Sequence, residues 1–123
     1  MKLAFVKMPP TYADWYKQPF LGISYISSYL ESKGYECNLF DAYYHSWSYD
    51  ELYDKVMEYE PDVIGITAMT YEVIRASQFA EDVKKERNIT AIVGGPHVTA
   101  LPERTLDEFD AFEDISVSED FFV

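Results

Sequence analysis

The stretch DVIGITAMTYEVIRASQFAEDVKKERNITAIVGGPH, residues 62–97, decides the fold of this chain. An apolar run at 62–67 is followed by a helical pattern at about 71–87 and a second apolar run at 90–93. This order predicts two buried parallel strands joined by a helix, because parallel strands need a crossover connection. The helix face expected to pack on the sheet carries Val73, Ala76, Ala80 and Val83.

The same alternation continues in both directions. Apolar runs predict strands at 3–6, 36–40, 62–67, 90–93 and about 114–117. Helical patterns cover about 20–32, the segment from a Ser48–Glu51 capping box to Pro61, about 71–87, and a short stretch from about Pro102. A loop is expected at 42–47. Residues 1–123 are therefore predicted to form a single α/β domain with a doubly wound, five-stranded parallel sheet of the flavodoxin-like (Rossmann-like) class.

Composition restricts the partners of this domain. The formal net charge of -12 disfavours nucleic acid and an anionic membrane surface, and no apolar run approaches the roughly 20 residues of a spanning helix. The start of the chain is too short and too charged for a signal peptide, so a cytoplasmic location is expected. With Cys37 as the one cysteine, neither an internal disulfide nor a multi-cysteine metal site can form.

Ligands of doubly wound sheets bind beyond the carboxyl ends of the strands. The loops expected at that edge are 8–18, 41–47, 68–70, 94–99 and 118–120. None contains the glycine pattern of a dinucleotide-binding turn or of a triphosphate-binding loop. After the first strand, Pro9 and Pro10 lack the N–H donors that a phosphate would need. The third strand ends at Thr67 and Ala68, without the aspartate that a response-regulator receiver requires.

Four phrases together carry a family resemblance. They are GITAMT at 65–70, IVGGPH at 92–97, PFLGISY at 19–25 and FDA at 40–42. The chain resembles the N-terminal cobalamin-binding domain of cobalamin-dependent radical-SAM enzymes, over nearly its whole length. The resemblance implies a cobalamin-binding module of a methyltransferase or cyclase. It also implies a cofactor site made of Gly22, Asp41, Thr67, Met69, Thr70, Gly94, Gly95, Pro96 and His97.

Several of these residues have a functional and a structural interpretation. Thr67 takes the place of the family serine that hydrogen-bonds the cobalamin tail, and Met69 takes the place of a leucine; Thr67 also suits a strand by propensity alone. Gly94 and Gly95 would let the backbone approach the tail, or would simply form a tight turn after a strand. His97 could ligate a metal, but a lone loop histidine is more often solvated or hydrogen-bonded, and the same holds for His45.

The sequence departs from the cobalamin motif in which a histidine ligates cobalt from below. By spacing, that motif falls on residues 17–22, where Lys17 stands for the aspartate and Pro19 for the histidine. Only Gly22 matches. We therefore expect no lower histidine ligand from this domain and no protein ligand to a metal. Many radical-SAM relatives share this departure.

Catalysis is not expected from the domain alone. Radical-SAM chemistry needs three cysteines around an iron–sulfur cluster, and one cysteine cannot supply them. The cluster and S-adenosylmethionine are expected only in a downstream radical-SAM domain, which this sequence lacks. Only Glu119 matches the family's Gly-Glu-Gly-Glu phrase, and the chain is interpreted as a fragment of a longer protein in preference to a stand-alone homologue.

Two other functions stay open at this point. The first is a degenerate module that binds no cofactor and docks on a partner through aromatic residues. Tyr43, Tyr44, Trp47 and Tyr49 crowd one loop, and Tyr12, Trp15 and Tyr16 crowd another; such residues serve interfaces and ligand sites, or pack over a sheet edge. The second is a nucleotide- or flavin-binding module with an unrecognised loop.

Overall fold

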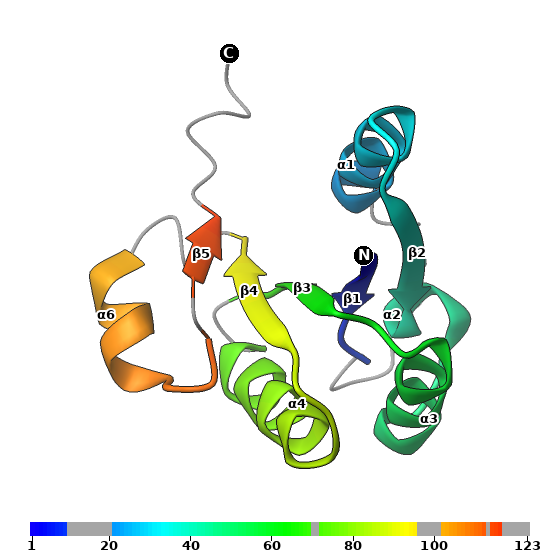
Figure 1. The fold of residues 1–123 in the computed structure, drawn as a ribbon. Coiled ribbons are helices and arrows are strands. Elements are labelled where there is room, and N and C mark those ends of the chain that lie inside the picture. Colours follow the sequence, from blue (N-terminus) through cyan, green and yellow to red (C-terminus); the bar gives the residue numbers. More distant parts are fainter. Residues whose placement is uncertain (10–20, 70–71, 96–101, 113, 117–123) are drawn as a thin grey trace.

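The computed structural model describes residues 1–9, 21–69, 72–95, 102–112 and 114–116. Strands and helices alternate along it (Figure 1). The strands are β1 (Lys2–Lys7), β2 (Glu36–Asp41), β3 (Val63–Thr67), β4 (Thr90–Gly94) and β5 (Asp114–Ser116). The helices are α1 (Leu21–Ser32), α2 (Ala42–His45), α3 (Tyr49–Tyr59), α4 (Val73–Glu86) and α6 (Pro102–Glu108).

The strands form one parallel sheet in the order β2-β1-β3-β4-β5, with the three-residue β5 at one edge. The predicted α/β architecture with a parallel sheet is confirmed. Successive connections run outward from β1 towards β2 and from β3 towards β4, so the direction of winding reverses between β1 and β3. In sheets of this kind, that reversal is where ligands bind.

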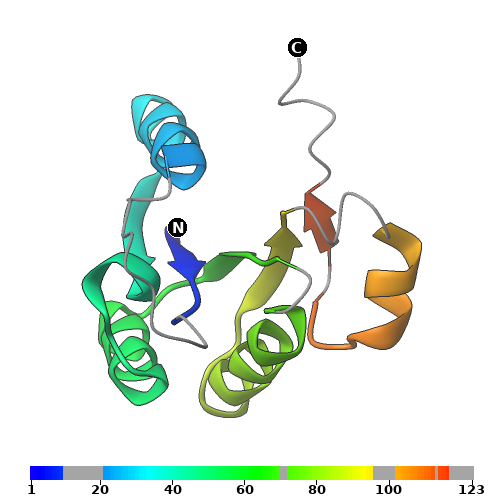
Figure 2. The same cartoon turned by 180° about the vertical axis from the view of Figure 1, so that it is seen from behind.

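One face of the sheet is buried along β1, β3 and β4. The residues of these three strands on that face are at most 2% exposed, and they are Ala4, Val6, Ile64, Ile66, Ala91 and Val93. Helices α3 and α4 both lie on this side, as the two opposite views show (Figures 1 and 2). They contribute Leu52 and Val56 from α3 and Ala76, Phe79, Ala80 and Val83 from α4, all of them fully buried. The apolar face predicted for α4 is thereby confirmed.

The opposite face is less completely covered. Helix α1 lies on this side, near β2 (Figure 1). The strand residues Leu3, Phe5, Val63, Gly65 and Ile92 are only half-buried. A Cβ atom on Gly65 would lie 3.1 Å from the Phe5 ring, so the absence of a side chain at Gly65 lets that ring pack on β3.

The prediction of a loop at 42–47 is wrong in one respect, because this segment contains the short helix α2. Asp41 caps this helix, with its Oδ1 atom accepting a hydrogen bond of 2.9 Å from the Tyr44 backbone N–H. At Ser48 the serine half of the predicted capping box opens α3, because Ser48 Oγ accepts from the Glu51 backbone N–H at 3.1 Å. The same hydroxyl donates to Glu51 Oε1 at 3.3 Å.

No helix in the described part of the chain is long and apolar enough to cross a membrane.

Candidate functional site

The carboxyl ends of the five strands form one row. Strand register aligns Asp41 of β2 with Lys7 of β1, Lys7 with Thr67 of β3, Thr67 with Gly94 of β4, and Gly94 with Ser116 of β5. We call these five residues the edge row. It crosses the point between β1 and β3 where the winding reverses. Three residues predicted from sequence, Asp41, Thr67 and Gly94, are therefore brought together where a ligand of this fold would bind.

The turn after β3 exposes alternate residues. Thr67 is half-buried, Ala68 is fully buried, and Met69 is 38% exposed. An exposed apolar side chain of this size beside a strand end can cover the face of a bound molecule. The structure thus leaves the side chain of Met69 accessible at the edge, directly after Thr67.

Backbone contacts join the end of β4 to the turn after β3. The Ala68 backbone N–H donates to the Gly94 carbonyl at 2.9 Å. Gly95 has φ +114, and a Cβ atom there would lie 2.5 Å from the Ala68 carbonyl oxygen. Glycine at 95 is therefore required by the fold itself, through its left-handed backbone and the close approach of Ala68. This requirement holds whether or not a ligand is present.

Asp41 also has a structural role, because its side chain caps α2. Gly22 lies in the first turn of α1. Three residues of the predicted site, Thr70, Pro96 and His97, lie outside the described residues, as do Tyr12, Trp15, Tyr16 and the Lys17–Pro19 part of the lower-ligand slot.

A buried ion pair lies at the edge row, and sequence reasoning missed it. Lys7 Nζ donates to Glu72 Oε1 at 2.6 Å, and the two side chains are 11% and 3% exposed. The same carboxylate oxygen accepts the Met69 backbone N–H at 3.0 Å. The residues are 65 positions apart in sequence, and neither lies in a motif, so no local signal indicated the pair.

The aromatic residues after β2 divide into two groups. Trp47 and Tyr49 pack against the core, and the Tyr49 ring meets Phe79 edge-on at 5.8 Å. Tyr44 is 39% exposed. His45, which is exposed, stacks on Trp47 with ring centroids 4.7 Å apart. Packing over the sheet thus accounts for Trp47 and Tyr49, while Tyr44 is presented outward.

Among the described residues, no three His, Cys, Asp or Glu side chains are grouped so as to hold a metal ion.

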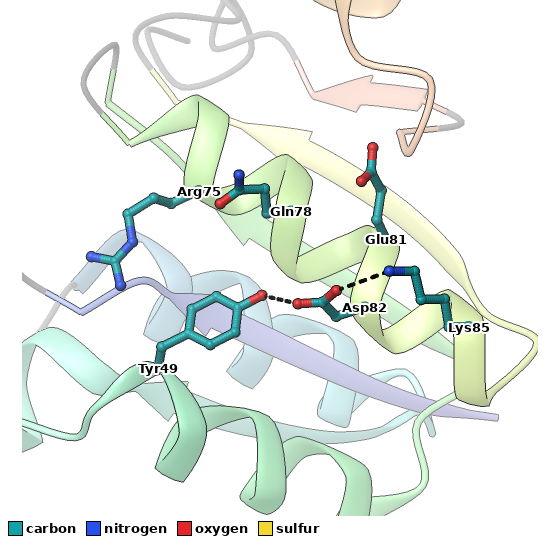
Figure 3. Close-up of a pocket in the computed structure, with 6 residues that line it drawn as sticks. All are labelled: Tyr49, Arg75, Gln78, Glu81, Asp82 and Lys85. Atoms are coloured by element: carbon teal, nitrogen blue, oxygen red, sulfur yellow. Dashed lines mark hydrogen bonds and ion pairs between the residues drawn. The ribbon is translucent and has the colours of Figure 1, made fainter.

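A polar pocket of about 480 Å³ lies between α3 and α4, lined by Tyr49, Arg75, Gln78, Glu81, Asp82 and Lys85 (Figure 3). Its charges are partly paired within it: the Tyr49 hydroxyl donates to Asp82 Oδ2 at 2.5 Å, and Lys85 lies 3.6 Å from Asp82. Burial and the bond to Asp82 raise the pKa of Tyr49.

Comparison with known proteins shows the family of this chain. The family model described as the B12 binding domain matches residues 16–120, which is most of the chain. The chain belongs to the B12-binding domain family. The family predicted from sequence is thereby confirmed.

The curated relatives of this B12-binding domain include two larger proteins. An uncharacterized methyltransferase of Pyrococcus horikoshii is 28% identical over 93 residues, which cover 73% of this chain and 20% of that protein. The anaerobic magnesium-protoporphyrin IX monomethyl ester cyclase of Rubrivivax gelatinosus is 32% identical over 90 residues, which cover 70% of this chain and 16% of the cyclase. The chain thus spans a fifth or less of these relatives.

Among solved structures, the radical S-adenosylmethionine methyltransferase TsrM from Kitasatospora setae, determined with cobalamin and a [4Fe-4S] cluster bound, matches with a TM-score of 0.71. The identity is 14%, over 89% of this chain and 22% of TsrM. A second TsrM structure, with tryptophan substrate and a SAM analog, gives a TM-score of 0.67 at 15% identity, over 88% of this chain and 22% of TsrM. At such identities the likeness concerns the fold.

Proposed function

We propose that this domain binds cobalamin at the edge row and serves a radical-SAM enzyme of the methyltransferase or cyclase type. The observation that carries the proposal is the alignment of Asp41, Thr67 and Gly94 across the winding reversal of a B12-binding domain. The described residues fit such a ligand. Met69 is exposed beside Thr67, and the sheet face on the α1 side is only half-buried.

The residues of the chain would hold and orient the cofactor. Thr67 would offer a hydroxyl, and Gly94 would keep bulk away from the strand end. Met69 would contribute apolar contact. Thr70, Pro96, His97, Gly95, Asp41 and Gly22 complete the proposed set. Bound cobalamin would supply a cobalt centre that can carry a methyl group, while the protein supplies binding and orientation.

The cobalt is proposed to receive no lower histidine from this domain. Pro19 stands where the motif has histidine, and the chain has only two histidines, His45 and His97. His45 is exposed on α2, where its ring stacks on Trp47. Replacing both histidines by alanine should leave the absorption spectrum of the bound cofactor unchanged. A shift of that spectrum would contradict this part of the proposal.

The reaction itself is proposed to depend on a separate domain of the same enzyme. An iron–sulfur cluster is held by several cysteine thiolates, and Cys37 is the one cysteine of this chain. That separate domain would bind the cluster and S-adenosylmethionine, and would be the main protein partner of this one.

The binding proposal is tested by titrating the chain with hydroxocobalamin and following the corrin absorption. We expect a saturable change at one equivalent. Absence of any change at tens of micromolar protein would contradict cofactor binding by the chain.

A second candidate is a docking module without cofactor, favoured by Tyr44, whose side chain is 39% exposed on α2. It predicts association with a partner through this residue. Tyr44→Ser should then weaken partner binding. Trp47→Ser would be a poor probe, because Trp47 packs against the core and its loss would disturb the fold.

A further inference from the structure

Lys7 is the second residue of the edge row and stands beside the point where the winding reverses. As the last residue of β1, it is aligned with Asp41 on one side and with Thr67 on the other. Its side chain is only 11% exposed, although lysine is rarely buried without a partner. Glu72, which lies between the end of β3 and the start of α4, is such a partner.

Glu72 holds the turn after β3 in two ways. Its backbone N–H donates to the Met69 carbonyl at 2.9 Å, and its Oε1 atom accepts the Met69 backbone N–H at 3.0 Å. Glu72 therefore closes the turn by bonding to both the carbonyl and the N–H of Met69. Through the bond from Lys7 to the same Oε1 atom, the closed turn is tied to the end of β1.

Lys7 reaches a third segment as well. Its Nζ atom lies 5.8 Å from the centroid of the Tyr43 ring, on α2 after β2. A single ammonium group thus contacts residues that follow two other strands of the row, Glu72 after β3 and Tyr43 after β2. Cation–aromatic contacts of this kind gain strength when the cation is shielded from water.

A buried ion pair is a poor device for stability alone. Removing two charges from water costs energy, and apolar residues of similar volume often stabilise a protein as well or better. What the pair does supply is a fixed geometry, because charge-assisted hydrogen bonds are short and directional. Here that geometry fixes where Met69 stands relative to β1.

We propose that Lys7 and Glu72 are positioning residues that hold the Met69 turn and Tyr43 in place for the ligand of the edge row. We call this pair the edge latch. The role of the edge latch in ligand binding rests on the proposed binding of cobalamin. Its role in holding the turn after β3 does not depend on that proposal.

The test compares two matched double variants of the 123-residue chain. Lys7→Met with Glu72→Gln removes both charges of the edge latch but keeps an amide oxygen for the Met69 N–H. Lys2→Met with Glu36→Gln makes the same two replacements at the other end of β1, where Lys2 and Glu36 form an exposed pair 3.8 Å apart. The first readout is amide hydrogen exchange at Met69 without ligand, and the second is hydroxocobalamin affinity.

The edge-latch variant should speed exchange at Met69 and weaken hydroxocobalamin binding, each by about tenfold, a usual size for coupling between sites. Circular dichroism should show it folded, and the control should change neither quantity. Unchanged exchange would overturn the latch. Faster exchange with unchanged affinity would overturn its role for the ligand. If the parent chain binds no cobalamin, the proposed function fails while the exchange result still decides the latch.

A milder variant covers the case in which the edge-latch variant does not fold. Lys7→Gln with Glu72→Gln removes both charges, so neither is left buried without a counter-ion. Amide groups at both positions can still hydrogen-bond to each other, and an amide oxygen at position 72 can still accept the Met69 N–H, but neutral hydrogen bonds are roughly half as strong as charge-assisted ones. Exchange at Met69 should rise by a smaller factor. No rise in this variant would overturn the proposal.

Discussion

The two ends of strand β1 carry lysine–glutamate pairs of opposite character. At the amino end, Lys2 and Glu36 lie 3.8 Å apart with side chains 43% and 60% exposed. At the carboxyl end, Lys7 and Glu72 are 2.6 Å apart and almost fully buried. The first is a surface pair of the ordinary kind, screened by water. The second has been taken out of water at the edge where this fold binds ligands, which is where a fixed arrangement of loops is needed.

The glycines near the amino and carboxyl ends of the strands also differ, and the one with close neighbours is again at the carboxyl end. Gly34, which precedes β2, has φ +94, and a Cβ atom placed on it would have no neighbouring atom within 4 Å. Gly95, which follows β4, has φ +114, and a Cβ atom there would lie 2.5 Å from the Ala68 carbonyl oxygen. The amino-end turn needs glycine for backbone conformation alone, whereas the carboxyl-end turn needs it for conformation and space. Of these two glycines, only Gly95 at the carboxyl edge lies closely against neighbouring backbone.

The largest expected effect comes from breaking one partner of each pair. Lys7→Met alone leaves the Glu72 carboxylate buried without its cation, which should lower the free energy of unfolding by about 3–5 kcal/mol. Lys2→Met should cost less than about 1 kcal/mol, because its pair is exposed. Urea denaturation of both variants measures the difference. Equal losses would show that the two ends of β1 are not different in the way described.

The glycines give the next largest effect. Gly95→Ala should lower the free energy of unfolding by about 1–3 kcal/mol or more, through strain and the clash with Ala68. Gly34→Ala should cost only about 1 kcal/mol, since only the left-handed backbone opposes it. Thermal denaturation without any cofactor checks this pair. If Gly95→Ala is as stable as the parent chain, the turn after β4 is not packed as described.

A smaller effect is expected at the strand ends themselves. Thr67→Val keeps the branched shape at the carboxyl end of β3 but removes the hydroxyl, which should weaken hydroxocobalamin binding by about 2- to 10-fold, the worth of one hydrogen bond. Thr90→Val makes the same change at the exposed first residue of β4, at the amino end. It should leave affinity unchanged. Isothermal titration of both variants measures this, and equal affinities would remove Thr67 from the site.

The smallest effect concerns Tyr59, whose backbone carbonyl accepts a hydrogen bond from Lys2 at the amino end of β1. Its hydroxyl lies 3.5 Å from Glu36 Oε2, and burial together with the Glu36 charge raises its pKa to about 12. An unfolded tyrosine ionises near pH 10, so between about pH 10 and 12 the unfolded state loses its proton first. Stability from this group is therefore complete below about pH 10 and falls as pH rises towards about 12.

Urea denaturation across that pH range measures the effect. Tyr59→Phe should make the fall with pH shallower, because it removes the ionising hydroxyl. An identical pH dependence in the variant would mean that Tyr59 contributes nothing to it.

Much of the fold could be predicted because its signals are local. Apolar runs, the Ser48–Glu51 capping box and the face of α4 all depend on residues near one another in sequence. The helix α2 was missed because one turn of helix has no periodicity to detect, although Asp41 before Ala42 is a capping signal.

The residues of the candidate site likewise divide into those with a local sequence signal and those without one. The alignment of Asp41, Thr67 and Gly94 in one row could be predicted because parallel strands bring their carboxyl ends together, and a family phrase contains each of these residues. The reason for Gly95 lies in its approach to Ala68, and the reason for Lys7 lies in Glu72. Both are contacts between segments remote in sequence, which no local pattern reveals.

The central claim, that the carboxyl edge of this B12-binding domain takes cobalamin, is tested most directly by blocking one edge at a time. Hydroxocobalamin would be titrated into the chain, into Thr67→Trp at the carboxyl edge and into Thr90→Trp at the amino edge. We expect saturable binding by the chain and by Thr90→Trp, and none by Thr67→Trp. Binding to Thr67→Trp with the affinity of the chain, or no binding to the chain at all, would contradict the claim.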